Sequence, residues 1–122
     1  MPMCLKIMVI EDDAEILYIV YVLLTEEGHK VIHSSDLEII KEVNTIQPDV
    51  ILLDELLGNE KGSEACKALK ANTATSHIPV VMMSALLGIE KMAAEAGADG
   101  FLRKPFHREE LSATVRHWQT KS

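Results

Sequence analysis

Short apolar segments alternate with amphipathic segments along the whole chain, and this alternation restricts the fold more than any other feature. The apolar segments have the length of buried strands, and the amphipathic segments show a helical period, as at Leu37, Ile40 and Val43. We expect strands at residues 5–10, 29–34, 49–53, 80–83 and 101–102, helices at residues 14–27, 36–46, 63–71, 86–96 and 107–119, and a loop at residues 55–62. Unbroken apolar strands that alternate with helices predict an α/β protein with a parallel sheet covered on both faces. A closed eightfold barrel needs about 250 residues, so the chain of 122 residues predicts an open, doubly wound sheet in three layers.

The composition limits the classes of function. With 12 basic and 19 acidic residues the formal charge is −7, which argues against direct nucleic-acid binding, because such domains carry clustered Lys and Arg. Cys4 and Cys66 lack the spacing of a zinc site or a disulfide framework. The longest apolar run, Ile16 to Leu24, is too short to span a membrane, and the N-terminal sequence lacks the pattern of a leader peptide. We therefore expect one soluble cytoplasmic domain.

Polar side chains follow four of the five expected strands. In doubly wound sheets, ligands bind at the carboxyl ends of the strands, so these residues are the first candidates for a functional site. They are Glu11, Asp12 and Asp13 after the first strand, Asp54 after the third, Ser84 after the fourth and Lys104 after the fifth. Acidic groups, a hydroxyl and an ammonium group are thus predicted to meet at one edge of the sheet.

Such a cluster of carboxylates favours a cation. Two carboxylates about 5 Å apart repel by roughly 3 kcal/mol at an effective dielectric constant near 20, equivalent to about two pKa units. Mg²⁺ prefers oxygen ligands and binds through one or two carboxylates together with phosphate oxygens. Aspartate is also a covalent acceptor of phosphate. The pattern therefore predicts phosphoryl chemistry at Asp54, with the metal and Lys104 neutralising the phosphoryl charge.

With these residues, the sequence resembles the receiver domain of two-component response regulators. The motifs stand in the order typical of that family: Glu11-Asp12, Asp54, Gly62, Ser84-Ala85 and Lys104-Pro105-Phe106, with GADGFLRKPF at residues 97–106. The resemblance covers about Leu5 to Trp118 and implies a flavodoxin-like (βα)5 fold with strand order 2-1-3-4-5. We expect residues 1–122 to be a single receiver domain, with a core at about residues 5–118 and no output domain.

The resemblance also implies a role for each matching residue. Asp54 is the expected phosphoacceptor. Asp12, Asp54 and the main-chain carbonyl of Leu56 would bind Mg²⁺ (or Mn²⁺), with Glu11 acting in the same cluster through a water. Lys104 would pair with the phosphoryl group, Ser84 would be the switch hydroxyl and Phe101 the switch aromatic. Asp13 is expected to cap the helix at residues 14–27 instead.

The family's chemistry implies the partners. The phosphoryl group would come from a phosphohistidine of a sensor histidine kinase or a histidine phosphotransfer protein, and the switched surface would act on a downstream protein or a fused output domain. The domain would take part in its own phosphorylation and dephosphorylation without being an enzyme. On the helix at residues 14–27 we expect the sheet-facing residues to be Ile16, Ile19, Val20, Leu23 and Leu24. Leu17, Tyr18 and Tyr21 would then share an outer face that could meet the partner.

The segment after Asp54 departs from the family pattern at two positions, and three rival functions are open. The family usually has Met or Leu after the phosphoacceptor and then Pro, whereas Glu55 follows Asp54 here and Gly58 replaces the proline, which predicts a more flexible loop. An aspartate-dependent phosphatase would need an acid where Leu56 stands. A receiver-like protein that only binds partners, without being phosphorylated, would not need the acidic residues of the site, yet all of them are present here. A flavodoxin-type redox carrier would need a phosphate-binding loop after the first strand.

Overall fold

The computed structural model describes residues 4–119, so the expected domain limits at residues 1 and 122 lie outside the described residues. Its central sheet has five strands, all paired in parallel, in the order β2-β1-β3-β6-β7. The strands are β1 (Lys6–Ile10), β2 (Lys30–Ser34), β3 (Val50–Asp54), β6 (Val80–Ser84) and β7 (Gly100–Arg103). Counting the sheet strands alone, this is the predicted order 2-1-3-4-5, and each predicted strand end lies within one residue of the observed end.

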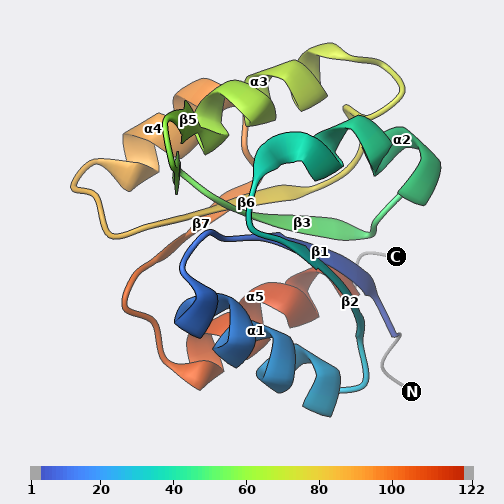
Figure 1. Ribbon diagram of the computed structural model, residues 1–122, viewed down its shortest axis with the longest axis vertical. Helices are drawn as coiled ribbons and strands as arrows, with labels where there is room; N and C mark the ends of the chain where they lie inside the picture. Colours follow the sequence, from blue (N-terminus) through green and yellow to red (C-terminus); the bar gives the residue numbers. More distant parts are fainter. Residues whose placement is uncertain (1–3, 120–122) are drawn as a thin grey trace.

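Helices cover both faces of the sheet, which gives three layers (Figure 1). One face carries α1 (Ala14–Glu26) and α5 (Arg108–Gln119), and the other carries α3 (Gly62–Ala71), α4 (Ile89–Ala96) and the 3₁₀ helix η1 (Leu37–Glu42) with the one-turn α2 (Val43–Ile46). No helix in residues 4–119 has both the length and the apolar character that crossing a bilayer requires.

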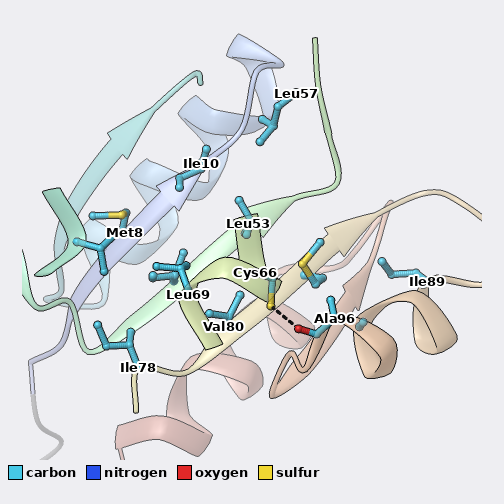
Figure 2. Packing of buried hydrophobic residues seen from close by; sticks show 14 residues of the cluster. Met8, Ile10, Leu53, Leu57, Cys66, Leu69, Ile78, Val80, Ile89 and Ala96 are labelled. Atoms are coloured by element: carbon cyan, nitrogen blue, oxygen red, sulfur yellow. Dashed lines mark hydrogen bonds between the residues drawn. The ribbon is translucent and has the colours of Figure 1, made fainter. Parts of the chain in front are cut away.

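Alternate residues of each strand supply two separate cores, because successive side chains of a strand point to opposite faces. Met8, Ile10, Leu53 and Val80 pack under α3 and α4, as Figure 2 shows, and the buried thiol of Cys66 there donates to the Ala96 carbonyl at 3.5 Å. The other core, against α1 and α5, contains Ile7, Val9, Leu52, Val81 and Met83. The central strands β3 and β6 are buried throughout, which explains their uninterrupted apolar sequences.

Three segments differ from the sequence-based expectation. The predicted α-helix at residues 36–46 was wrong over its first half, which is the 3₁₀ helix η1 and is followed by α2. Its apolar side chains are mostly half-buried, and β-branched residues such as Ile39 and Ile40 are poor helix formers. Helix α4 begins at Ile89 because Gly88 before it has a φ of 84°. The predicted loop at residues 55–62 contains a small hairpin of β4 (Leu56–Leu57) and β5 (Glu60–Lys61).

Candidate functional site

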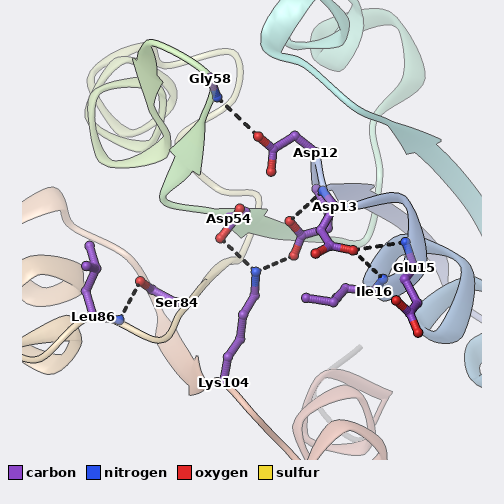
Figure 3. Close-up of polar contacts among 10 residues, drawn as sticks. Asp12, Asp13, Glu15, Ile16, Asp54, Gly58, Ser84, Leu86 and Lys104 are labelled. Atoms are coloured by element: carbon purple, nitrogen blue, oxygen red, sulfur yellow. Dashed lines mark hydrogen bonds and ion pairs between the residues drawn. The ribbon is translucent and has the colours of Figure 1, made fainter.

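The carboxyl ends of four parallel strands meet at one edge of the sheet and bring the predicted polar residues together (Figure 3). Glu11 follows β1, Asp54 ends β3, Ser84 ends β6 and Lys104 follows β7. These strands are neighbours in the sheet, so side chains up to 93 residues apart in sequence come into hydrogen-bonding contact. The expected convergence is therefore present in the structure.

Three carboxylates form the centre of this site. Glu11, Asp12 and Asp54 each place a carboxylate oxygen within 4.8 Å of the others. Glu11 and Asp54 are buried, whereas Asp12 is exposed, so the cluster opens to solvent on the Asp12 side. A buried wall of carboxylate oxygens with one open side suits a hard divalent cation that keeps several waters.

Lys104 balances part of this negative charge. Its Nζ lies 3.1 Å from Asp54 Oδ1 and also donates to Glu11 Oε1. Burial alone would lower the pKa of Lys104, but its hydrogen bonds to Glu11 and Asp54 raise that pKa above the ordinary value, so the ammonium is charged at neutral pH.

The pKa of Glu11 is raised as well, which for a carboxyl group disfavours the charged form. Burial raises the pKa of Glu11 to about 7, and the nearby Asp54 adds to this effect, although the Lys104 hydrogen bond opposes it. The Lys104 hydrogen bond thus does not fully offset the effect of burial on Glu11. The donor set therefore fits a divalent cation.

The two acids after Glu11 take different positions. Asp12 Oδ2 accepts a hydrogen bond from the Gly58 amide at 3.2 Å, across the site from the β3–α3 loop. Asp13 Oδ1 accepts from the amides of Glu15 and Ile16 at 3.0 and 3.1 Å. Asp13 therefore caps α1, as the sequence predicts.

Ser84 and Phe101 contact residues outside the carboxylate cluster. The Ser84 hydroxyl is buried and accepts a hydrogen bond from the Leu86 amide at 3.0 Å. The Phe101 ring is 40% exposed on β7, with the Arg103 guanidinium 5.9 Å from its centroid. Leu56 begins β4 with its side chain half-exposed. Their functional roles stay predictions.

The outer face of α1 carries the predicted tyrosines. Tyr18 is 69% exposed, and Tyr21 stacks edge to face on His33 at a centroid distance of 5.4 Å. Leu17 is half-buried against the core and lines a shallow groove of about 390 Å³ with these rings. Leu17, Tyr18 and Tyr21 thus lie on one side of α1, and the contact of this face with a partner stays a prediction.

The expectation that Ile19 faces the sheet was wrong. Val20 is completely buried and Ile19 is 48% exposed, because adjacent helix residues point about 100° apart. Ile19 lines a second, apolar groove of about 420 Å³ with Ile16, Pro105 and Phe106. The sequence does not reveal this groove, because one wall comes from α1 and the other from Pro105 and Phe106, far away along the chain.

Sequence reasoning also missed the burial of Glu55 and its hydrogen-bond partner. This residue is 2% exposed, and its carboxylate accepts hydrogen bonds from the amide and the hydroxyl of Ser63. A glutamate directly after an apolar strand was the available signal, but the sequence does not reveal its partner eight residues later.

A family model described as the response regulator receiver domain matches residues 7–116. Among curated relatives, the phosphate regulon transcriptional regulatory protein PhoB of Escherichia coli (strain K12) is 36% identical over 118 residues, covering 93% of this chain and 51% of PhoB. The DNA-binding response regulator MtrA of Mycobacterium tuberculosis (strain CDC 1551 / Oshkosh) is 32% identical over 114 residues, covering 91% of this chain and 49% of MtrA. The chain thus spans about half the length of these relatives. The names of these relatives, a transcriptional regulatory protein and a DNA-binding response regulator, do not support the expectation that this chain lacks direct nucleic-acid binding. That expectation stays a prediction.

Solved structures show the same likeness. Chemotaxis response regulator CheY4 of Vibrio cholerae superposes with a TM-score of 0.85 at 26% identity, covering 95% of this chain and 99% of that one. The receiver domain of NtrX from Brucella abortus gives a TM-score of 0.83 at 28% identity, with the same coverage of 95% and 99%. By its family match, its fold and its strand-end residues, this chain belongs to the response regulator receiver domains of two-component systems.

Proposed function

We propose that Asp54 accepts a phosphoryl group in a reaction that requires Mg²⁺ or Mn²⁺. The observation that carries this proposal is the cluster of Glu11, Asp12 and Asp54 oxygens within 4.8 Å, next to Lys104 at 3.1 Å from Asp54. Asp12, Asp54 and the Leu56 carbonyl would hold the cation, with Glu11 acting through a water. When bound, the cation supplies positive charge to the phosphoryl oxygens during transfer.

The chain's own residues orient the acceptor. Lys104 holds Asp54 Oδ1, which limits the rotation of the carboxylate, and its ammonium faces the position of the incoming charge. With a phosphohistidine donor, an Asp54 oxygen forms a bond to phosphorus while the bond from phosphorus to the histidine nitrogen breaks. That nitrogen retains the electron pair and takes up a proton. The product is an acyl phosphate on Asp54 and a free histidine.

The new charge would then change the surface through Ser84 and Phe101. The Ser84 hydroxyl, now bound to the Leu86 amide, would turn to donate to a phosphoryl oxygen. That movement would free space for the half-exposed Phe101 ring to turn inward. We propose that residues 1–122 form one receiver domain whose altered surface acts on a downstream protein or an output domain. The donor would be a sensor histidine kinase or a histidine phosphotransfer protein.

The test is labelling by a small phosphodonor. The protein is incubated with acetyl phosphate and Mg²⁺, and intact mass spectrometry counts the phosphoryl groups on the wild type, Asp54→Asn and Asp13→Asn. We expect one group on the wild type and on Asp13→Asn, whose amide still caps α1, and none on Asp54→Asn. An unlabelled wild type, or equal labelling of Asp54→Asn, contradicts the proposal. Sustained turnover of phosphate esters would favour the phosphatase alternative instead.

A further inference from the structure

Glu55 directly follows the proposed phosphoacceptor, and within residues 4–119 its buried carboxylate has Ser63, and no lysine or arginine, as its hydrogen-bond partner. The side chain lies inside at 2% exposure, with its Oε1 2.6 Å from the Ser63 amide nitrogen and its Oε2 3.0 Å from the Ser63 hydroxyl. Burying a carboxylate is unfavourable unless hydrogen bonds compensate. Here the donors come from the first turn of α3, where the helix dipole also favours negative charge. We call this pair of contacts the Glu55–Ser63 clamp.

The main chain of Glu55 makes two more hydrogen bonds at the same place. Its amide donates to the Met83 carbonyl at 3.1 Å, and its carbonyl accepts from the Gly62 amide at 2.8 Å. Gly62 packs so closely that a Cβ there would lie 2.1 Å from the Asp54 carbonyl oxygen. The end of β3 and the start of α3 are therefore fastened to each other through Glu55.

The segment between these two points reaches the carboxylate cluster. It forms the hairpin of β4 and β5, turns at Gly58 with a φ of 64°, and donates the Gly58 amide to Asp12 Oδ2 at 3.2 Å. A chain segment with glycine at its turn has high conformational freedom. Fixing both of its ends reduces that freedom, and it also fixes the Leu56 main chain.

We propose that Glu55 is a positioning residue for the cation site. Through the Glu55–Ser63 clamp it holds the β3–α3 loop so that Asp12, Asp54 and the Leu56 carbonyl are in place before the cation binds. Gly58 stands where the family usually has a proline, so this loop lacks the constraint that a proline ring imposes. In this chain the buried, hydrogen-bonded Glu55 carboxylate constrains the loop instead. The inference rests on the proposed function of the site, and it concerns the geometry of the site instead of its chemistry.

Three substitutions at the clamp separate its hydrogen bonds from its charge. Glu55→Met keeps the length of the side chain and removes both acceptor oxygens. Glu55→Gln keeps an acceptor for the Ser63 amide and removes the charge. Ser63→Ala removes the hydroxyl contact alone, in case Glu55→Met fails to fold. Thr75→Val is the matched control, because it deletes the buried hydrogen bond from Thr75 Oγ1 to the Leu69 carbonyl at the other end of α3.

The measurements are the Mg²⁺ dissociation constant by calorimetry and the rate of acetyl phosphate labelling against Mg²⁺ concentration. We expect Glu55→Met to raise the dissociation constant about tenfold, as for other residues that orient metal ligands, and Ser63→Ala to raise it less. The labelling rate at saturating Mg²⁺ should stay within about twofold of the wild type, because the acceptor chemistry is intact. Glu55→Gln and Thr75→Val should bind Mg²⁺ as the wild type does.

Each other result overturns the inference for a different reason. Unchanged Mg²⁺ affinity in Glu55→Met and Ser63→Ala would show that the clamp does not set the site. Equal losses in Glu55→Met and Glu55→Gln would assign the effect to charge. An equal loss in Thr75→Val would assign it to general stability of α3. If the wild type itself neither binds Mg²⁺ nor is labelled, the proposed function fails, and this outcome is recognised before any variant is compared.

Discussion

At the scale of single residues, environment gives identical chemical groups different tasks. Glu11, Asp12 and Asp13 are consecutive carboxyl groups, yet one is buried with a pKa of about 7, one faces the site and one caps a helix. The three acids lie between β1 and α1, where the chain leaves the buried sheet, so Glu11 is still buried while Asp12 and Asp13 are exposed. Assigning roles to such a run therefore needs the burial of each member.

His29 gives a prediction about pH and stability. Burial lowers the pKa of His29 below 6.5, although Glu27 opposes this effect, and its Nδ1 accepts a hydrogen bond from the Leu5 amide at 3.1 Å. The unfolded chain therefore takes up this proton at a higher pH than the folded protein does. The stabilising contribution of His29 is complete above pH 6.5 and is lost as the pH falls through the folded-state pKa.

The measurement compares the wild type with His29→Asn, whose amide oxygen offers a similar acceptor that does not titrate. Between pH 7.5 and 5.5 the free energy of urea unfolding should fall more steeply in the wild type, by up to about 1 kcal/mol. Glu11 acts in the opposite direction because its folded-state pKa is raised, but it is present in both proteins and cancels in the difference. Parallel pH profiles for the two proteins would refute the prediction.

At the scale of elements, the junction between β3 and α3 depends on the absence of one side chain. A Cβ at Gly62 would lie 2.1 Å from the Asp54 carbonyl oxygen, which is backbone and cannot move aside cheaply, whereas a Cβ at Gly100 would meet Val81 at an ordinary 3.9 Å. We expect Gly62→Ala to lower the free energy of unfolding by about 3 kcal/mol. Gly100→Ala should leave it unchanged or raise it by up to about 1 kcal/mol. Similar losses in urea titrations of both variants would contradict this account.

At the scale of the whole molecule, the parallel sheet concentrates acidic side chains at one edge, and a cation should therefore stabilise the fold. At a Mg²⁺ concentration about a hundred times its dissociation constant, binding adds about 2.7 kcal/mol to stability, which corresponds to roughly 10 °C in Tm. Thermal unfolding with and without Mg²⁺ should show this shift for the wild type and Asp13→Asn, but a much smaller one for Asp12→Asn. A full shift in Asp12→Asn would remove it from the proposed cation ligands.

The exposed face of α1 is the proposed contact for the phosphodonor protein. Tyr18 and Tyr21 border the groove beside Leu17, and exposed aromatic residues supply much of the binding energy at protein interfaces. Replacing both tyrosines with Ser should slow phosphotransfer from the cognate phosphohistidine protein about tenfold and leave labelling by acetyl phosphate unchanged. Equal transfer rates from the protein donor would exclude this face from the contact.

Much of this architecture could be predicted from local patterns. The apolar runs at β3 and β6 predict buried strands because both faces of these strands are covered, and Asp54 was identifiable as an acid directly after such a strand. The 3₁₀ geometry of η1 could not be predicted, because its leucine and isoleucines have a helical spacing but remain half-buried. The same limit applies to Ile19, whose exposure depends on the rotation of α1 against the sheet.

The order of strands and helices, and the acids and the lysine at the strand ends, are local properties, and the sequence alone was sufficient to predict them. The contacts among those residues were decided by tertiary structure: the pairing of Lys104 with both Glu11 and Asp54, the Gly58 amide on Asp12 and the Glu55–Ser63 clamp. The physical reason is that a side chain's charge state and hydrogen bonds depend on its burial and its neighbours in space. In a parallel sheet those neighbours come from strands that are far apart along the chain.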